Sequence, residues 1–131
     1  MGYLLDTNIV IEICNVHETV ARQYVRCCAT TFISALCLAE LQRGLLIDTV
    51  LAQGRRERLD ILLRSVPVLA FDKAAAEAYG RIIARCGWVR SRDFDRMIAA
   101  HAIGMSSVLV TNNEADFRDI PGLKIENWTV D

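Results

Sequence analysis

The order of apolar and polar positions along the chain predicts short buried strands separated by amphipathic helices. Apolar or β-branched runs that end at polar or turn-forming residues mark the strands. The expected strands lie at residues 3–5, 31–33, 66–70, 108–110 and 123–125. Pro67 stands near the start of the third, where a residue without an N–H is tolerated. The last strand follows the Pro121-Gly122 turn.

Apolar residues at helical spacing fill the segments between these strands. The expected helical segments lie at residues 9–13, about 18–27, 34–45, 48–64, about 72–86 and about 95–103. Asp6 and Ser34 are suited to cap two of them, and Gly87 is suited to end another. Strands that alternate with helices indicate a mostly parallel sheet covered on both faces. We therefore expect one three-layer α/β domain over residues 1–131.

Composition narrows the class of protein. Hydrophobic residues make up 53% of the 131 positions, which is enough for a core and argues against disorder. No apolar run reaches the roughly 20 residues of a membrane span, and the N-terminus lacks the basic start of a signal peptide. The five cysteines show no CxxC spacing, so we expect no structural zinc site and a reducing cytoplasmic environment.

The charge pattern adds a hint about ligands. The formal net charge is −1, yet 13 of the 15 basic residues are arginine. Arginine binds phosphate in a bidentate manner better than lysine does. Salt bridges on helix faces explain the arginines equally well, so the bias alone does not decide the function.

Several acids fall where an α/β sheet forms its binding sites, outside the carboxyl ends of the strands. Asp6 follows the first strand directly, and Thr111 follows the strand at 108–110. Glu40 and Asp95 stand on predicted helices. Each acid has an ordinary alternative as a helix cap, a helix-dipole partner or a solvated side chain. Spacing alone does not establish that they converge.

The chain resembles the PIN domain, and most closely the VapC toxins of bacterial type II toxin–antitoxin pairs. The resemblance covers essentially the whole chain, and its blocks occur in the family's order. These are Leu4-Leu5-Asp6-Thr7-Asn8, Ile33-Ser34-Ala35 through Leu38-Ala39-Glu40-Leu41 to Gly44, Phe94-Asp95-Arg96-Met97-Ile98-Ala99-Ala100-His101-Ala102, Leu109-Val110-Thr111-Asn112-Asn113, and Asp116-Phe117 with Ile120-Pro121-Gly122-Leu123 and Glu126-Asn127-Trp128.

The resemblance implies a Rossmann-like PIN fold and a site that binds Mg²⁺ or Mn²⁺. By matching positions, the catalytic and metal-binding acids are Asp6, Glu40 and Asp95. Many relatives carry aspartate where this chain has Asn113, so Asp116 is the candidate for the fourth acid, and the number of metals stays open. Supporting polar roles are expected for Thr7, Ser34, Thr111, Asn113 and Asp93, beside the alternative that they are ordinary caps. For Arg90, Arg92 and Arg96 we expect RNA phosphate contacts, with ion pairing as the alternative. His101 is expected to pack in the core or at an interface, with catalysis as the alternative.

The resemblance further implies an endoribonuclease that cuts single-stranded or looped RNA, with initiator tRNA as the leading candidate, by in-line attack of metal-activated water. Such cleavage leaves a 5′-phosphate and a 3′-hydroxyl. The implied partners are a VapB-type antitoxin and a second copy of the chain, in a higher toxin–antitoxin assembly. Two alternatives remain: a non-catalytic PIN-like module that binds RNA or protein, and a phosphotransfer domain. The second would need another acid beside Asp6, which Asp6-Thr7-Asn8 lacks.

Overall fold

The structure, a computed structural model, describes residues 2–47 and 52–130. Within them, one parallel sheet has the strand order β3-β2-β1-β4-β5. The strands are β1 (Tyr3–Leu5), β2 (Thr31–Ser34), β3 (Val68–Leu69), β4 (Val108–Val110) and β5 (Ile125–Glu126). The expected sheet is confirmed, and all of its strand pairs are parallel.

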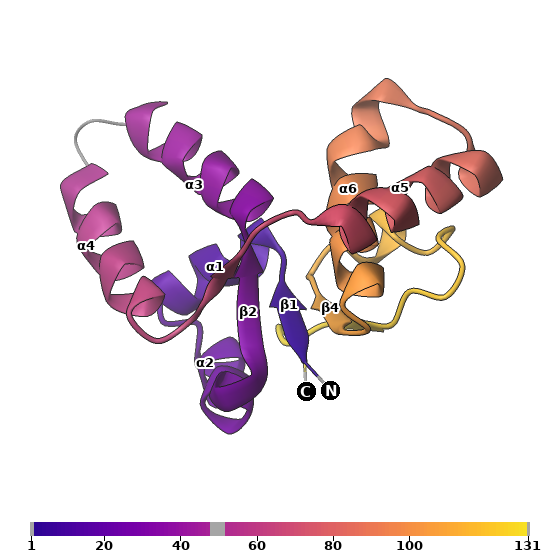
Figure 1. Cartoon of the computed structure of the whole chain (residues 1–131). Coiled ribbons are helices and arrows are strands. Elements are labelled where there is room, and N and C mark those ends of the chain that lie inside the picture. Colours follow the sequence, from indigo (N-terminus) through magenta and orange to yellow (C-terminus); the bar gives the residue numbers. More distant parts are fainter. Residues whose placement is uncertain (1, 48–51, 131) are drawn as a thin grey trace.

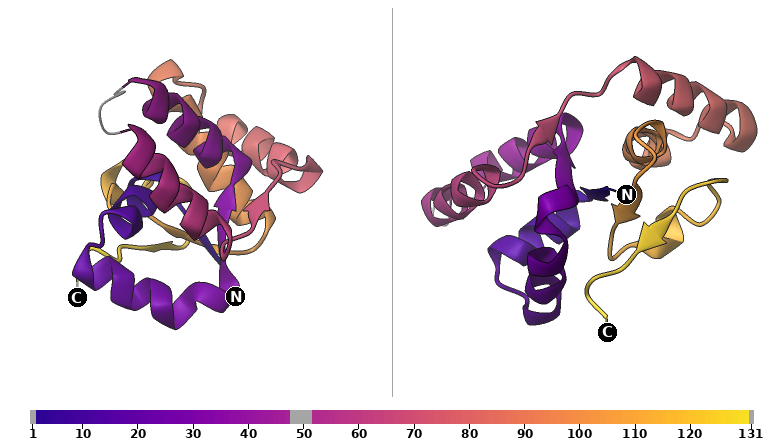
Figure 2. Two further views of the ribbon diagram at one scale, coloured as in Figure 1. Left: turned by 90° about the vertical axis from the view of Figure 1, so that its left-hand side faces the viewer. Right: turned by 60° about the horizontal axis from the view of Figure 1, so that its bottom comes forward.

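Helices lie on opposite sides of the central strands in two groups (Figures 1 and 2). One group contains α1, which contacts α2, α3 and α4; in the other, α5 packs along α6. The helices are α1 (Thr7–Cys14), α2 (Glu18–Cys27), α3 (Ala35–Ile47), α4 (Ala52–Leu63), α5 (Lys73–Cys86) and α6 (Asp93–Gly104). Three 3₁₀ turns, η1 (Cys28–Thr30), η2 (Arg90–Arg92) and η3 (Glu114–Asp116), complete the described elements. The three-layer arrangement agrees with the alternation read from the sequence.

The central strand β1 is buried on both faces, as parallel strands covered by helices are. Leu5 pairs with Ile33 of β2 on one side and with Val110 of β4 on the other, and all three are fully buried. Large apolar side chains from the C-terminal segment, Phe117 and Trp128, complete the core beside them. No helix in the described ranges is both long and apolar enough to cross a membrane.

Several boundaries differ from the sequence expectation. The strand expected at 66–70 is reduced to Val68–Leu69, because it is an edge strand that pairs only with β2. The carbonyl of Pro67 still accepts a hydrogen bond from the N–H of Ile33 at 3.0 Å. The last strand lies at Ile125–Glu126 rather than 123–125.

The helix limits also shift. Helix α6 begins at Asp93, two residues before the expected Asp95, because η2 continues directly into it. Helix α5 begins after Asp72, whose Oδ1 accepts from the N–H of Ala75 at 2.9 Å. Gly87 ends α5 with a φ of 79°, a conformation that favours glycine. The start of the helix expected at 48–64 falls partly on residues 48–51, outside the described residues.

The sheet has a topological switch at β1. The chain adds β2 and β3 on one side of β1, then crosses to add β4 and β5 on the other. The carboxyl ends of β1 and β4 therefore lie side by side, and the N–H of Asp6 donates to the carbonyl of Val110 at 2.9 Å. Such a switch point is where open α/β sheets form binding crevices.

Candidate functional site

Asp6 occupies the end of β1 and caps α1. Its Oδ1 accepts from the N–H of Thr7 at 2.8 Å, and its Oδ2 accepts from the hydroxyl of Thr111 at 2.9 Å and the amide of Asn8 at 3.3 Å. Its side chain is almost fully buried. Burial therefore raises the pKa of Asp6, with a smaller contribution from Glu40, while these hydrogen bonds oppose the shift.

Polar side chains after β4 hold the two strand ends together. The Thr111 hydroxyl, which donates to Asp6, accepts from the N–H of Asn113 at 3.0 Å. The side-chain Nδ2 of Asn8 also donates to the Thr111 hydroxyl at 3.4 Å. The Oδ1 of Asn8 accepts from the N–H of Asn112 at 3.3 Å. The loop after β4 is thus fixed against Asp6 by neutral donors, none of which cancels its charge.

Asp95 enters the same region from the first turn of α6. Its pKa is raised to about 6, first by burial and then by the negative charges of Asp6, Asp116 and Glu40, whereas Arg92 opposes the rise. Each acid therefore lies close enough to disfavour the ionised form of Asp95. This mutual repulsion is the electrostatic signature of a gathered set of carboxylates.

Glu40 reaches the region from α3 and is more exposed than Asp6. Its carboxylate lies 3.9 Å from the guanidinium of Arg43, one helical turn further along α3. The Arg43 side chain is 76% exposed, so this ion pair is screened by water and contributes little stability.

Asp116 and Asn113 form a pair at the edge of the site. The Asn113 amide donates to Asp116 Oδ2 at 2.6 Å. Asn113 lines the groove described below, whereas Asp116 is not among the lining residues. The structure thus places the amide at the groove and the carboxylate behind it, near enough to raise the pKa of Asp95.

Ser34 and His101 form a buried contact that sequence reasoning did not predict. The Ser34 hydroxyl accepts from the N–H of Leu36 at 3.1 Å and lies 2.9 Å from His101 Nδ1. The hydroxyl oxygen has two lone pairs, so it either donates to Nδ1 or accepts from Nδ1–H, according to the tautomer of the imidazole. Burial lowers the pKa of His101, with Asp72 opposing the shift. The contact links the start of α3, which carries Glu40, to α6, which carries Asp95.

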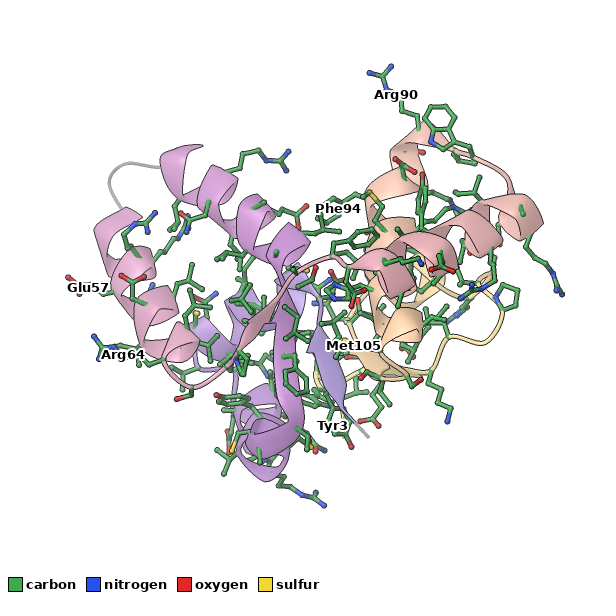
Figure 3. The ribbon with its side chains drawn as sticks, viewed as in Figure 1. Tyr3, Glu57, Arg64, Arg90, Phe94 and Met105 are labelled. Carbon is green, nitrogen blue, oxygen red and sulfur yellow. The ribbon has the colours of Figure 1, made fainter. Side chains whose placement is uncertain are left out.

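The arginines expected to bind RNA beside the acids have different environments. Arg96 is buried against the rest of the fold, and its guanidinium lies 3.1 Å from Asp119. Its Nε and Nη1 have no hydrogen-bond partner among the described residues. This burial argues against the expected phosphate contact, because RNA cannot reach the side chain. Arg92 is half exposed and lies 3.8 Å from Asp119, and Arg90 projects away from the fold (Figure 3).

The remaining expected residues have structural contacts. The Asp93 carboxylate accepts a short hydrogen bond from the Tyr79 hydroxyl, which ties the start of α6 to α5. The hydroxyl of Thr7 is buried next to the thiol of Cys37 on α3. Thr7 nevertheless lies at the groove, beside Asp6.

A groove of about 570 Å³ collects the acids at one end. Asp6, Glu40 and Asp95 all line it, so the structure brings the three principal candidates to one surface. From here on, "the groove" means the depression lined by Asp6, Thr7, Asn8, Ile11, Cys14, Asn15, Glu40, Leu41, Arg43, Gly44, Leu45, Arg55, Arg58, Leu59, Asp95 and Asn113. It lies between the switch point and the paired helices α3 and α4.

The donor set fits a hard divalent cation that keeps part of its water shell. Carboxylate, amide and hydroxyl oxygens are the ligands that such ions prefer, and Mg²⁺ usually retains several waters. No three of the described His, Cys, Asp and Glu side chains are gathered tightly enough to surround an ion directly. The neighbouring acids disfavour the ionised form of Asp95 and raise its pKa, so a cation among them would remove an electrostatic cost.

Comparison with known proteins gives a consistent result. The PIN domain family model matches residues 3–123. Ribonuclease VapC2 of Rickettsia felis and the tRNA(fMet)-specific endonuclease VapC of Salmonella typhimurium are each 34% identical to this chain. In both comparisons the match covers 98% of this chain and 98% of the relative. Among solved structures, VapBC2 from Rickettsia felis bound to a promoter DNA fragment superposes with a TM-score of 0.84 at 31% identity, covering 98% of this chain and 99% of the other. DNA-bound VapBC from Salmonella typhimurium gives 0.85 at 31% identity, covering 98% of each.

Proposed function

The chain belongs to the PIN-domain family, and on that premise we propose that it is a VapC-type endoribonuclease, the toxin of a toxin–antitoxin pair. The observation that carries this proposal is the set of acids at the switch point. Asp6, Glu40 and Asp95 come from three different elements and line one groove. Burial, followed by the charges of neighbouring acids that include Asp6 and Glu40, raises the pKa of Asp95 to about 6. A module that only bound protein would gain nothing from collecting carboxylates that repel one another.

Asp6, Glu40 and Asp95 would hold Mg²⁺ or Mn²⁺, with Asn113 and Asp116 at the edge of the site. When bound, such an ion lowers the pKa of water and neutralises charge on a phosphodiester. The chain's own residues orient the acids: Thr111 and Asn8 fix Oδ2 of Asp6, and the first turn of α6 positions Asp95. The proposed products carry a 5′-phosphate and a 3′-hydroxyl. A 2′,3′-cyclic phosphate would contradict this chemistry.

The substrate and partners follow from the relatives. Two of them are named tRNA(fMet)-specific endonucleases, so initiator tRNA is the substrate we propose to test first. The VapBC structures that superpose on the chain support a VapB-type antitoxin as its partner. By the family resemblance alone, we also propose that the toxin forms homodimers within that assembly. An RNA substrate and unpaired cysteines are consistent with action in the cytoplasm.

Asp6→Asn tests the proposal most directly. We expect wild-type protein with Mg²⁺ to cut RNA, and we expect EDTA or Asp6→Asn to abolish cleavage. Asn is also a good helix cap, so α1 should persist, and circular dichroism checks this. Asp60→Asn, an exposed acid of α4 outside the groove, is the matched control and should keep wild-type activity. Cleavage that survives both EDTA and Asp6→Asn would refute the metal-dependent function.

A further inference from the structure

The groove extends past the acids to a basic wall. Arg55 and Arg58 of α4 form this wall as part of the groove lining, and Arg43 of α3 belongs to the same lining. Apolar side chains, among them Leu41 and Leu59, also line it. One continuous surface therefore contains carboxylates, an apolar strip and guanidinium groups.

Arg55 and Arg58 are free to bind a ligand. They stand three positions apart on α4, so they share one face of the helix. Both are exposed, and neither forms an ion pair with an acid in the part of the chain that the structure describes. Arg43 differs, because it lies 3.9 Å from Glu40.

The neighbours of these arginines on α4 are engaged elsewhere. The Arg56 guanidinium donates to Gln42 of α3 at 2.7 Å, which joins the two helices. Glu57 points outward from α4, away from α3 (Figure 3). Only the face with Arg55 and Arg58 turns to the groove. The charge of Arg58 also opposes the burial that raises the pKa of the Cys14 thiol, which places this guanidinium near the end of α1.

We propose that Arg55 and Arg58 bind phosphates of the RNA strand next to the phosphate that lies at the acids. This inference rests on the proposed function and adds the path of the substrate. A guanidinium forms paired hydrogen bonds to phosphate, and single-stranded RNA repeats phosphates along its length. The acids alone would repel such a strand, so a basic wall on the same groove supplies attraction that they cannot. The apolar side chains of the same lining, such as Leu41, suit contact with the ribose and base faces.

A salt titration of RNA binding tests the assignment without any cleavage. We would measure the Kd of a labelled single-stranded oligoribonucleotide in EDTA by fluorescence anisotropy, between 50 and 200 mM salt. Each phosphate contact contributes about 0.7 to the slope of log Kd against log salt. R55Q/R58Q should therefore lower the slope by about 1.4, so wild-type affinity falls about sevenfold more than that of the variant over this range.

Two control proteins make the result specific. R64Q removes an exposed arginine just beyond α4 that is not part of the groove lining, and it should keep the wild-type slope (Figure 3). R55K/R58K keeps both charges and should restore most of the slope. Thermal unfolding of each protein confirms that the exposed substitutions leave the fold intact.

The outcomes separate this inference from the proposed function. If wild type binds and cleaves RNA but R55Q/R58Q has the wild-type slope, the arginine assignment is wrong and the ribonuclease function stands. If the double variant instead loses binding to an acidic peptide while its RNA slope is unchanged, the wall serves a protein partner and the inference is again overturned. If wild type neither binds nor cleaves RNA, both proposals fail.

Discussion

Replacing Asp95 with asparagine should stabilise the folded protein while removing a proposed metal ligand. In the folded chain, burial and the charges of Asp6, Asp116 and Glu40 raise the pKa of Asp95 from 3.8 to about 6. At neutral pH the fold therefore carries an ionised carboxylate in a place that disfavours it. Asparagine has nearly the same shape and no charge, so Asp95→Asn removes the repulsion and keeps the packing.

The size of the effect follows from the pKa. A change from 3.8 to about 6 corresponds to about 3 kcal/mol in the free energy of unfolding. Asp95 is only partly buried, and water in the groove screens its neighbours, so we expect about 1–2 kcal/mol. The folded-state pKa lies above the unfolded one. The folded state therefore binds the Asp95 proton more tightly than the unfolded state does. Protonation of Asp95 thus stabilises the wild-type fold fully below about pH 4, and this contribution is lost as pH rises through 6.

Urea denaturation in EDTA, from pH 4 to pH 8, measures this dependence. The difference between Asp95→Asn and wild type should be near zero at pH 4 and should reach its full value above pH 7. Asp60→Asn, on exposed α4 surface, should show no such rise. Adding Mg²⁺ should stabilise wild type more than the variant, because the ion neutralises the acids. A variant less stable than wild type at pH 7.5, or a difference that is independent of pH, would refute the electrostatic account.

Two further pairs of substitutions, each a test and its control, probe the packing around the helix that carries Asp95. A Cβ at Gly104 would lie 2.9 Å from a backbone nitrogen of α5, so Gly104→Ala should lower the free energy of unfolding by about 1–3 kcal/mol, as measured by chemical denaturation. A Cβ at Gly80 meets nothing within 4 Å, so Gly80→Ala should leave the stability unchanged or raise it. Equal effects of the two would contradict the close approach. Asp119→Asn should lower the free energy of unfolding by about 1–3 kcal/mol, because it leaves the buried Arg96 without its ion pair. Glu77→Gln, which breaks an exposed ion pair, should change it by less than about 0.5 kcal/mol. A loss of similar size in both variants would show that the burial of Arg96 is unimportant.

The sequence predicted the central strands better than the edge strands, for a physical reason. The strands β1 and β4 are buried on both faces and read as continuous apolar runs, such as Tyr3–Leu5 and Val108–Val110. The edge strands β3 and β5 pair on one side only, and each is two residues long. Their limits depend on which backbone groups reach the neighbouring strand, which hydrophobic periodicity does not encode.

The same distinction applies to the site. Asp6 and Thr111 were identified from their places after strands, and the fold brings them within 2.9 Å of each other. Long-range partners could not be read from the sequence. Arg96 looked available for RNA because Asp119, its partner 23 positions away, gave no local signal. The contact between Ser34 and His101 spans 67 positions and was missed in the same way.

The hydrogen bonds of Asp6 explain why this site can be both rigid and electrostatically strained. One carboxylate oxygen caps α1 through Thr7, and the other accepts from Thr111 across the sheet switch. These donors are neutral: they fix the carboxylate without cancelling its charge, and burial still raises its pKa. A basic side chain in their place would stabilise the fold further, but it would occupy the position that a cation needs. The neutral cradle thus keeps the acids in place and leaves their charge available, which is the arrangement that the proposed metal-dependent nuclease requires.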